Sequence, residues 1–267
     1  MSINKKEVEW LPDERLRLEV KNKANEVILK FALKGITDIF DMIEDVAVLI
    51  RKPLNTTEIS GFSSYYNDLF LVFTNSSFTL GHERFTAAHE LYHIMYNKEM
   101  LTKEKVIFQQ YKKNIEEDKA NIFAAELLMP EDYVKELFYK LVNVEKDKVE
   151  VRHIVRLNST LKVSYKAMIK RLIQLDLCDI KLYDSLVEFG TVENAENLQR
   201  ITMMEGYTKE LIIPSKISYI SKEFIEKAKL NFENNIISYG MLSKLLNFIN
   251  QEPENYGYGR PNEGEFI

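Results

Sequence analysis

The most informative stretch of this chain is His89-Glu90-Leu91-Tyr92-His93, which reads HExxH. It lies within residues 81–97, where apolar residues recur at helical spacing. Residues four apart share one face of a helix, with Cβ atoms about 5–6 Å apart, so His89 and His93 can bind one Zn²⁺ at ~2.0–2.1 Å each. Glu90 follows the first histidine directly, where its carboxylate can reach a water on the metal and take its proton as general base.

A third metal ligand must come from elsewhere in the chain, because a zinc hydrolase needs three protein ligands and an open position for water. No HxxGxxH continuation follows His93 and no cysteine lies nearby, so a carboxylate on a second helix is expected. Glu116 and Glu117 begin a predicted helix over residues 115–129, where the helix dipole alone would also favour acidic residues. Weaker candidates are Glu104, Glu126 and Glu131.

Asn121 helps to separate the two leading candidates. It lies four residues after Glu117 and therefore on the same helix face. An amide at that position can accept a hydrogen bond from a ligand histidine, which is the support that outer-shell groups give to metal sites. Glu116 has Ala120 at the equivalent position. The spacing favours Glu117 and leaves Glu116 open.

Two longer stretches that contain these motifs resemble the ImmA/IrrE family of metallopeptidases. Residues 83–93 read ERFTAAHELYH and resemble the family pattern RFTxAHELGH. Residues 117–130 read EDKANIFAAELLMP and resemble ExxANxFAAELLMP. Further similarity lies in Ile59-Ser60-Gly61, in Phe73-Thr74-Asn75 and in VSYKAMIKRL at 163–172. The resemblance covers roughly residues 30–180 and, more loosely, 210–250.

The resemblance implies an α+β fold, that of a zincin-like metallopeptidase, in which an active-site helix packs on a small antiparallel or mixed sheet and a helical, helix-turn-helix-like region follows. It implies Zn²⁺ as cofactor, with His89, His93 and Glu117 as ligands and Glu90 as the catalytic acid/base. It also implies a bacterial or phage-encoded endopeptidase that cleaves a helix-turn-helix transcriptional repressor, in mobile-element induction or a stress response. The other classes of function that we consider are a non-catalytic repressor-binding protein and the toxin of a toxin–antitoxin pair.

Two residues near the motif have an open role. Tyr92 stands where the family usually has glycine, so its ring either packs or directs a phenol toward the site, and we favour packing. His82 lies seven residues before His89, two turns away on the same face, which is too far to bind the same metal from one straight helix. We expect His82 at the rim of the site or in solvent.

Periodicity and turn residues predict the remaining elements. Helices are expected over about 13–50 with a break near Gly35, and a strand at 46–50 is expected to end before Pro53. A hairpin is predicted from 59–66 and 69–74 around Asn67-Asp68. The strand at 69–74 is expected to line the substrate groove, where an extended peptide could add to its edge. Residues 98–112 read as a loop or frayed helix, and helices are expected at 131–142, 146–175, 221–231 and 238–249.

Within 146–175 the pattern is that of a helix-turn-helix, with a break at Asn158-Ser159-Thr160 and Ser164 as the N-cap of the second helix. The predicted organisation is therefore a zincin-like domain at 1–142, a helix-turn-helix-like module at 143–180, a helical extension at 181–250 and a flexible tail at 251–267.

Charge and composition restrict the class of protein. The chain of 267 residues has 36 basic and 41 acidic residues, a net charge of −5, which disfavours a nucleic-acid binder that uses its whole surface. Residues 146–171 hold eight Lys/Arg and two acidic residues, which gives this segment a net charge of +6. That segment could dock a partner or touch DNA, or it could be a solvated helical face, which we favour.

The expected compartment is the cytoplasm. The first residues lack the apolar region of a secretory signal, and no stretch approaches the ~18 apolar residues of a membrane-spanning helix. The single cysteine, Cys178, rules out an intramolecular disulfide.

Overall fold

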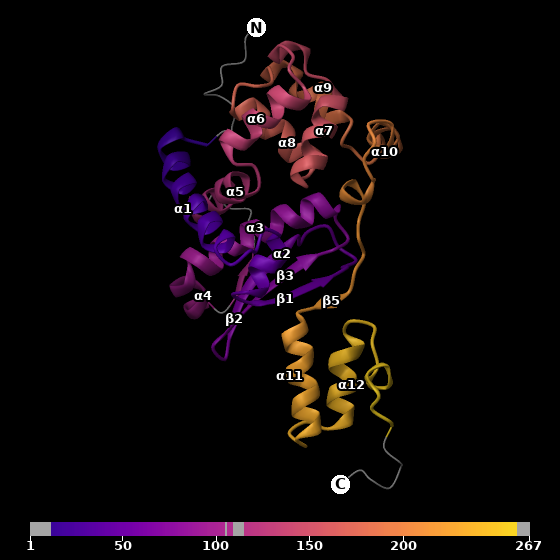
Figure 1. Ribbon diagram of the computed structural model, residues 1–267. Coiled ribbons are helices and arrows are strands. Elements are labelled where there is room, and N and C mark those ends of the chain that lie inside the picture. Colours follow the sequence, from indigo (N-terminus) through magenta and orange to yellow (C-terminus); the bar gives the residue numbers. More distant parts are fainter. Residues whose placement is uncertain (1–11, 105, 109–114, 261–267) are drawn as a thin grey trace.

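The computed structural model describes residues 12–104, 106–108 and 115–260, and Figure 1 traces their course. They combine helices with one sheet, which confirms the predicted α+β class. The strands are β1 (Val48–Lys52), β2 (Gly61–Tyr66), β3 (Leu69–Asn75), β4 (Val106–Phe108) and β5 (Tyr219–Ile220). The α-helices are α1 (Glu14–Ala32), α2 (Ile39–Glu44), α3 (Leu80–Tyr96), α4 (Lys98–Glu104), α5 (Ile115–Leu128), α6 (Glu131–Leu141), α7 (Val151–Leu161), α8 (Tyr165–Gln174), α9 (Tyr183–Glu188), α10 (Ala195–Met204), α11 (Lys222–Glu233) and α12 (Tyr239–Asn247). Short 3₁₀ helices lie at Lys146–Lys148, Ile180–Leu182, Glu210–Ile212 and Pro253–Tyr256.

The described strands form a mixed sheet in the order β4-β2-β3-β1-β5. The predicted hairpin is confirmed: β2 and β3 pair antiparallel around Asn67 and Asp68. Both turn residues have a positive φ, 47° and 63°, as a two-residue hairpin turn requires. β1 lies parallel to β3, which confirms the predicted strand before Pro53.

The predicted groove strand at 69–74 is not an edge. β3 pairs with β2 along Leu69–Thr74 and with β1 along Leu71–Asn75, so most of the strand has a neighbouring strand on both sides. The expectation that a peptide could add to β3 is therefore wrong. The edges of the sheet are β4 and β5, both too short to stand out in the sequence pattern.

Helices α3, α5 and α1 form successive layers next to the sheet (Figure 1). α3 contacts β2 and β3 and also packs on α5, which in turn packs on α1. One hydrophobic core joins these elements, with Phe31, Leu49, Leu91 and Phe123 buried in it. α3 is therefore enclosed by sheet and helices, and this burial is what places its polar residues in a shielded site.

A second core lies under α6 to α10, where Phe138, Ile154 and Leu172 are buried together. It continues past residue 180, because Leu186 and Leu198 belong to it. A third, smaller core joins β5 to α11 and α12, whose helical hairpin extends from the β5 edge of the sheet (Figure 1). The domain limits proposed from the sequence stay predictions.

The helix-turn-helix-like pair differs from the expectation in its turn. α7 runs through Asn158-Ser159-Thr160, so the predicted break there is wrong. The chain turns instead at Lys162, which has a left-handed φ of 54°, and Asn158 holds the turn by donating to the Val163 carbonyl. Ser164 caps α8 as predicted, accepting from the Ala167 N–H. The turn packs on the start of α3, where a Cβ on Gly81 would lie 2.7 Å from the Ser164 nitrogen.

The basic segment 146–171 does not present its charges as one face. Arg171 is fully buried against Glu126, Arg156 pairs with Glu205, and Lys146 lies 3.1 Å from Asp176. On α8 the side chain of Lys166 is exposed, whereas most of the helix is buried or half-buried. α8 is therefore packed against the rest of the fold over most of its length.

The C-terminal segment contains structure that the sequence reading missed. Its two predicted helices are present as α11 and α12, but α9, α10 and β5 were not expected. Within the predicted tail, the Pro253–Tyr256 turn buries Pro253, and Tyr256 and Tyr258 pack on the third core. Residues 261–267 of that tail lie outside the described part of the chain. Across the described residues, no helix combines the length and the apolar character needed to cross a bilayer.

Candidate metal centre and active site

Helix α3 carries the first two candidate ligands and the candidate base. Thr79 begins it as N-cap by accepting from the His82 N–H, and Asn97 ends it. His89, Glu90 and His93 are each 1% exposed. Ionisable groups buried to this degree need compensating partners. The contacts of these three residues therefore indicate which groups the site can bind.

Three of the predicted ligands converge. His89 Nε2 lies 3.1 Å from Glu117 Oε2, His93 Nε2 lies 3.3 Å from Glu117 Oε1, and the two Nε2 atoms are 3.2 Å apart. Their potential ligand atoms all lie within 4.8 Å of one another. Donor atoms around a tetrahedral zinc with bonds of ~2.0–2.1 Å are separated by about 3.3 Å. The observed separations therefore fit a metal ion, and two imidazoles with one carboxylate are a donor set typical of catalytic zinc.

Packing of α5 against α3 brings Glu117 to the histidines. Glu117 lies in the first turn of α5, and Ala120 and Ala124, which are fully buried, follow it along the helix. Burial alone would raise the pKa of the Glu117 carboxyl. Hydrogen bonds from His89 and His93 outweigh this and hold its pKa at about 2, so the group is an anion at neutral pH.

The second ring nitrogen of each candidate ligand histidine also has a partner. His89 Nδ1 lies 3.1 Å from Asn121 Oδ1, the contact expected from the spacing of Glu117 and Asn121. His93 Nδ1 lies 3.1 Å from Asn97 Nδ2, which the sequence reading missed. The signal was available, because Asn97 follows His93 by four residues on the same face of α3.

Glu90 lies on the sheet side of α3. Ser63 of β2, itself fully buried, donates from Oγ to Glu90 Oε2 at 2.5 Å. Burial raises the pKa of Glu90, while the two histidines and the hydrogen bond from Ser63 oppose that rise. Ser63 was not found from the sequence, since a serine inside a strand carries no signal of its own.

The close approach of β2 to α3 depends on Gly61. A Cβ at this position would lie 2.5 Å from Thr86 Cγ2 and 2.7 Å from the Phe73 carbonyl oxygen. The same Cβ would be 3.7 Å from Glu90 Cγ, so Gly61 and Ser63 together form the strand surface against the candidate base. Only glycine fits between this strand and helix.

Tyr92 and His82 are not part of the cluster formed by His89, His93 and Glu117. Tyr92 is buried between Tyr96 and Phe123, and its hydroxyl donates to Glu116 Oε2 at 3.0 Å, away from the histidine Nε2 atoms. His82 stacks on Phe78 and lies 3.1 Å from the Ser60 hydroxyl. The packing role favoured for Tyr92 matches this placement, and His82 lies at the start of the helix.

The other candidate carboxylates have different partners. Glu116 accepts from Tyr92 and from Lys119 at 3.0 Å, and Glu131 accepts from Lys21 and Lys135. Glu126 is enclosed by Arg17 and Arg171. The side chain of Glu104 lies outside the described residues. Of the carboxylates described, Glu117 is the one that meets the two histidines.

Two comparisons with known proteins bear on this site. No curated protein matches the chain. A family model, Peptidase_M78, described as the IrrE N-terminal-like domain, matches residues 44–172. This range runs from the end of α2 to α8 and contains the strands β1 to β4 as well as His89, His93 and Glu117. Residues 44–172 therefore form an IrrE N-terminal-like domain of the Peptidase_M78 family, which supports the resemblance to the ImmA/IrrE metallopeptidases.

Proposed function

We propose that this protein is a zinc-dependent endopeptidase that cleaves a partner helix-turn-helix transcriptional repressor and so relieves repression. The observation that carries the peptidase part is the convergence of His89, His93 and Glu117 beside the buried carboxylate of Glu90. The repressor as substrate rests on the resemblance to ImmA/IrrE proteins. The same resemblance, together with the single cysteine, supports a cytoplasmic location in a bacterium or a phage-infected cell.

His89, His93 and Glu117 would hold the ion. When bound, Zn²⁺ supplies Lewis acidity for hydrolysis of a peptide bond. The ligand set has a single negative charge, because the two imidazoles bind in their neutral form and Glu117 is an anion. That charge leaves the bound ion with a net positive charge, which is what stabilising an oxyanion requires.

Glu90 carries the proton transfers in this proposal. One of its carboxylate oxygens, Oε2, is held by the Ser63 hydroxyl, so Oε1 is the oxygen available to a water molecule. The carboxylate takes a proton from the attacking water and then delivers it to the nitrogen of the leaving amine. Burial and Ser63 together fix the carboxylate in one orientation, which such a two-way transfer requires.

The proposal is tested with the helix-turn-helix repressors encoded in the genome that carries this protein's gene, beginning with any in the neighbouring genes. Wild-type protein loaded with zinc is incubated with each repressor and compared with Glu90→Gln, which keeps the shape of the side chain and removes the base. We expect one cleavage product with the wild type and a rate about 10²–10⁴-fold lower with the variant. Glu99→Gln, on an exposed side chain, is the matched control and should cleave like the wild type.

Zinc content separates the outcomes. Glu90→Gln should retain one zinc per chain, because Glu90 is not among the ligands. If Glu90→Gln still relieves repression while the repressor stays intact, the protein acts by binding and the peptidase proposal fails. Wild-type protein that takes up no zinc would overturn the metal site itself.

A further inference from the structure

Tyr92 joins helix α3, which carries the two candidate histidine ligands, to helix α5. Its side chain is fully buried, and its hydroxyl donates to Glu116 Oε2 at 3.0 Å. The centroid of its ring lies 5.6 Å from that of Phe123. Phe123 follows Glu116 by seven residues, which is about two turns of α5. Tyr92 therefore contacts α5 at two points, one of them beside the candidate ligand Glu117.

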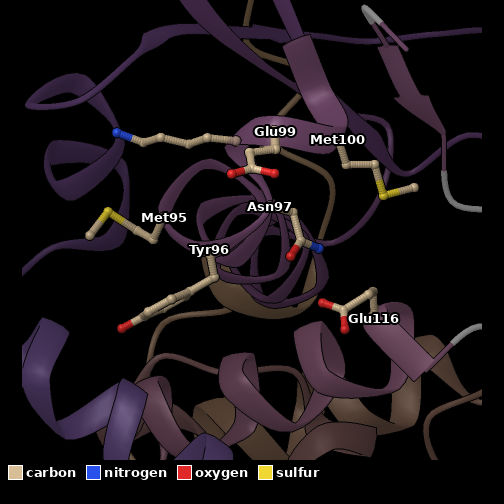
Figure 2. Close-up of a pocket in the computed structure, with 7 residues that line it drawn as sticks. Met95, Tyr96, Asn97, Glu99, Met100 and Glu116 are labelled. Carbon is tan, nitrogen blue, oxygen red and sulfur yellow. The ribbon is translucent and has the colours of Figure 1, made fainter. Parts of the chain in front are cut away.

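The first turn of α5 is the part of that helix that most needs contacts from outside. It contains Glu117, and the first N–H groups of a helix have no partner within the helix, so helix ends fray. On one side this turn borders a hollow of about 490 Å³ at the end of α3, which Glu116 lines (Figure 2). Side chains of α3 therefore help to determine how firmly the third candidate ligand is held.

We propose that Tyr92 is a positioning residue that holds Glu117 in place for metal binding, through its hydrogen bond to Glu116. The inference rests on the proposed zinc site and goes beyond it, because neither Tyr92 nor Glu116 belongs to the candidate ligands. The bond joins the helix of His89 and His93 to the helix turn of Glu117. Ligands that are already held at the right separation bind an ion without the cost of ordering them first.

Glu116 is held at both of its carboxylate oxygens. Oε2 accepts from the Tyr92 hydroxyl, and Oε1 accepts from Lys119 Nζ at 3.0 Å. The bond from Lys119 stays within α5, whereas the bond from Tyr92 crosses to α3. A side chain bound at both oxygens has little freedom to change its rotamer, so its attachment to Tyr92 also restrains the backbone turn that it shares with Glu117.

Tyr96, one turn further along α3, provides a natural comparison. Its hydroxyl donates to the Lys23 carbonyl of α1 at 3.1 Å, and Figure 2 shows Tyr96 and Glu116 on different sides of the end of α3. The hydroxyls of Tyr92 and Tyr96 thus hold different helices, α5 and α1. If the inference is right, removal of the two hydroxyls has different effects on the metal site.

The test measures zinc affinity by competition with a chelator of known affinity, in the full-length protein. Tyr92→Phe removes the hydroxyl and keeps the ring. We expect zinc affinity to fall about 2–10-fold, which corresponds to the loss of one hydrogen bond. The visible absorption spectrum of the Co²⁺-loaded protein should change as well, because it reports the geometry of the ligand set. Tyr96→Phe is the matched control and should bind zinc like the wild type.

Two variants of Glu116 test whether Tyr92 acts through this residue. Glu116→Gln and Glu116→Leu both remove the carboxylate, but only glutamine keeps an acceptor oxygen for the Tyr92 hydroxyl. Adding Tyr92→Phe should weaken zinc binding further in the Glu116→Gln protein. In the Glu116→Leu protein it should have no further effect, because the bond is already absent.

Thermal melting of the metal-free proteins distinguishes positioning from folding. Tyr92→Phe and Tyr96→Phe each lose one hydrogen bond between helices, so their melting temperatures should fall by similar amounts. Only Tyr92→Phe should also lose zinc affinity. If Tyr92→Phe does not fold, the comparison of Glu116→Leu with Glu116→Gln carries the test, and the leucine variant should bind zinc more weakly.

Zinc binding by Tyr92→Phe equal to that of the wild type, with an unchanged Co²⁺ spectrum, would overturn the inference and leave the proposed function standing. An equal loss of affinity in Tyr96→Phe would overturn it too, because the effect would then be a general loss of packing. Wild-type protein that binds zinc and never cleaves a repressor would overturn the proposed function and leave the inference standing. If the wild type binds no zinc, both are overturned.

Discussion

The two ends of helix α5 each bury a glutamate, but the glutamates meet different partners. At the start of the helix, Glu117 lies within 3.3 Å of the Nε2 atoms of His89 and His93. Toward its end, Glu126 accepts from Arg17 Nη1 at 2.9 Å and from both terminal nitrogens of Arg171 at 2.9 and 2.6 Å. One helix thus supplies a carboxylate to a candidate metal site and another to a closed ion-pair network.

The partners of a buried carboxylate determine whether it can bind a further ligand. Arginine is always charged and has no acceptor, so the Glu126 network is complete without any further ligand. Imidazole can be neutral and then offers a lone pair. A carboxylate facing two imidazoles is therefore able to share an ion with them, whereas one facing two guanidinium groups is not. Burial alone does not distinguish the roles of Glu117 and Glu126, because both are buried.

The strongest test of the comparison is Glu117→Gln, which removes the anion and keeps the shape. Zinc affinity should fall by more than about 100-fold, because loss of an outer-shell partner alone costs 10–100-fold. The measurement is chelator competition together with metal content after dialysis. Asp118→Gln, on the exposed next residue, should retain zinc. Retention of zinc by Glu117→Gln would return Glu116 and Glu104 to consideration as ligands.

The same exchange at the other end of α5, Glu126→Gln, should lower the stability of the fold and leave zinc affinity unchanged. It leaves Arg171, fully buried, and Arg17 without their counter-charge, which costs about 3–5 kcal/mol of unfolding free energy for a buried pair. Urea unfolding of the metal-free protein measures this. The folded fraction should still bind zinc normally. A loss of zinc affinity without loss of stability would contradict the division of roles between the two ends.

A smaller effect is expected from Gly61→Ala, which tests the sheet side of the site. The added Cβ would lie 2.5 Å from Thr86 Cγ2, so β2 and α3 must separate. Such overpacking typically costs about 1–3 kcal/mol, and the separation should also weaken the Ser63–Glu90 hydrogen bond. We expect lower stability in urea and slower peptide cleavage, with zinc content unchanged. Gly240→Ala, where a Cβ meets only a distant serine hydroxyl, is the control.

The smallest effect concerns Glu131, at the rim of the Glu126 network. Hydrogen bonds from Lys135 and Lys21 lower the pKa of its carboxyl from 4.5 to about 2. Because the pKa is depressed in the folded protein, the stability it contributes is present above pH 4.5 and is lost as the pH falls toward 2. Solvent and salt screen pairs at the rim, so we expect at most about 1 kcal/mol.

Urea unfolding of wild type and Glu131→Gln at pH 7 and pH 3 checks this expectation. The difference in stability between the two proteins should shrink at the lower pH and also in high salt. A difference that is equally large at both pH values would show that Glu131 acts through packing and not through its charge.

Local periodicity was sufficient for much of the candidate site. His89 and His93 were placed on one helix face by their spacing, and Glu117 and Asn121 by the same rule on a second helix. Asn97 follows the rule as well and was overlooked. The hairpin around Asn67-Asp68 was equally local, because its two turn residues and the alternating strands lie within one short stretch.

Other features depend on contacts between distant segments and have no local pattern. Ser63 meets Glu90 only because β2 packs on α3. β3 lies inside the sheet only because β1 pairs with it, which overturned its expected role as a peptide-binding edge. The turn between α7 and α8 was predicted too early because Asn158 is a common turn residue. Asn158 lies within α7, and its side chain donates to the Val163 carbonyl beyond the end of the helix.

From the sequence one can read which residue types are able to hold zinc and on which helix faces they lie, since helical spacing is a property of the local backbone. Tertiary structure alone decides that Glu117 meets two imidazoles while Glu126, nine residues later on the same helix, meets two guanidinium groups. The physical reason is that the partners of a buried charge come from other elements. Their identity decides whether the charge is satisfied within the fold or remains available to bind an ion.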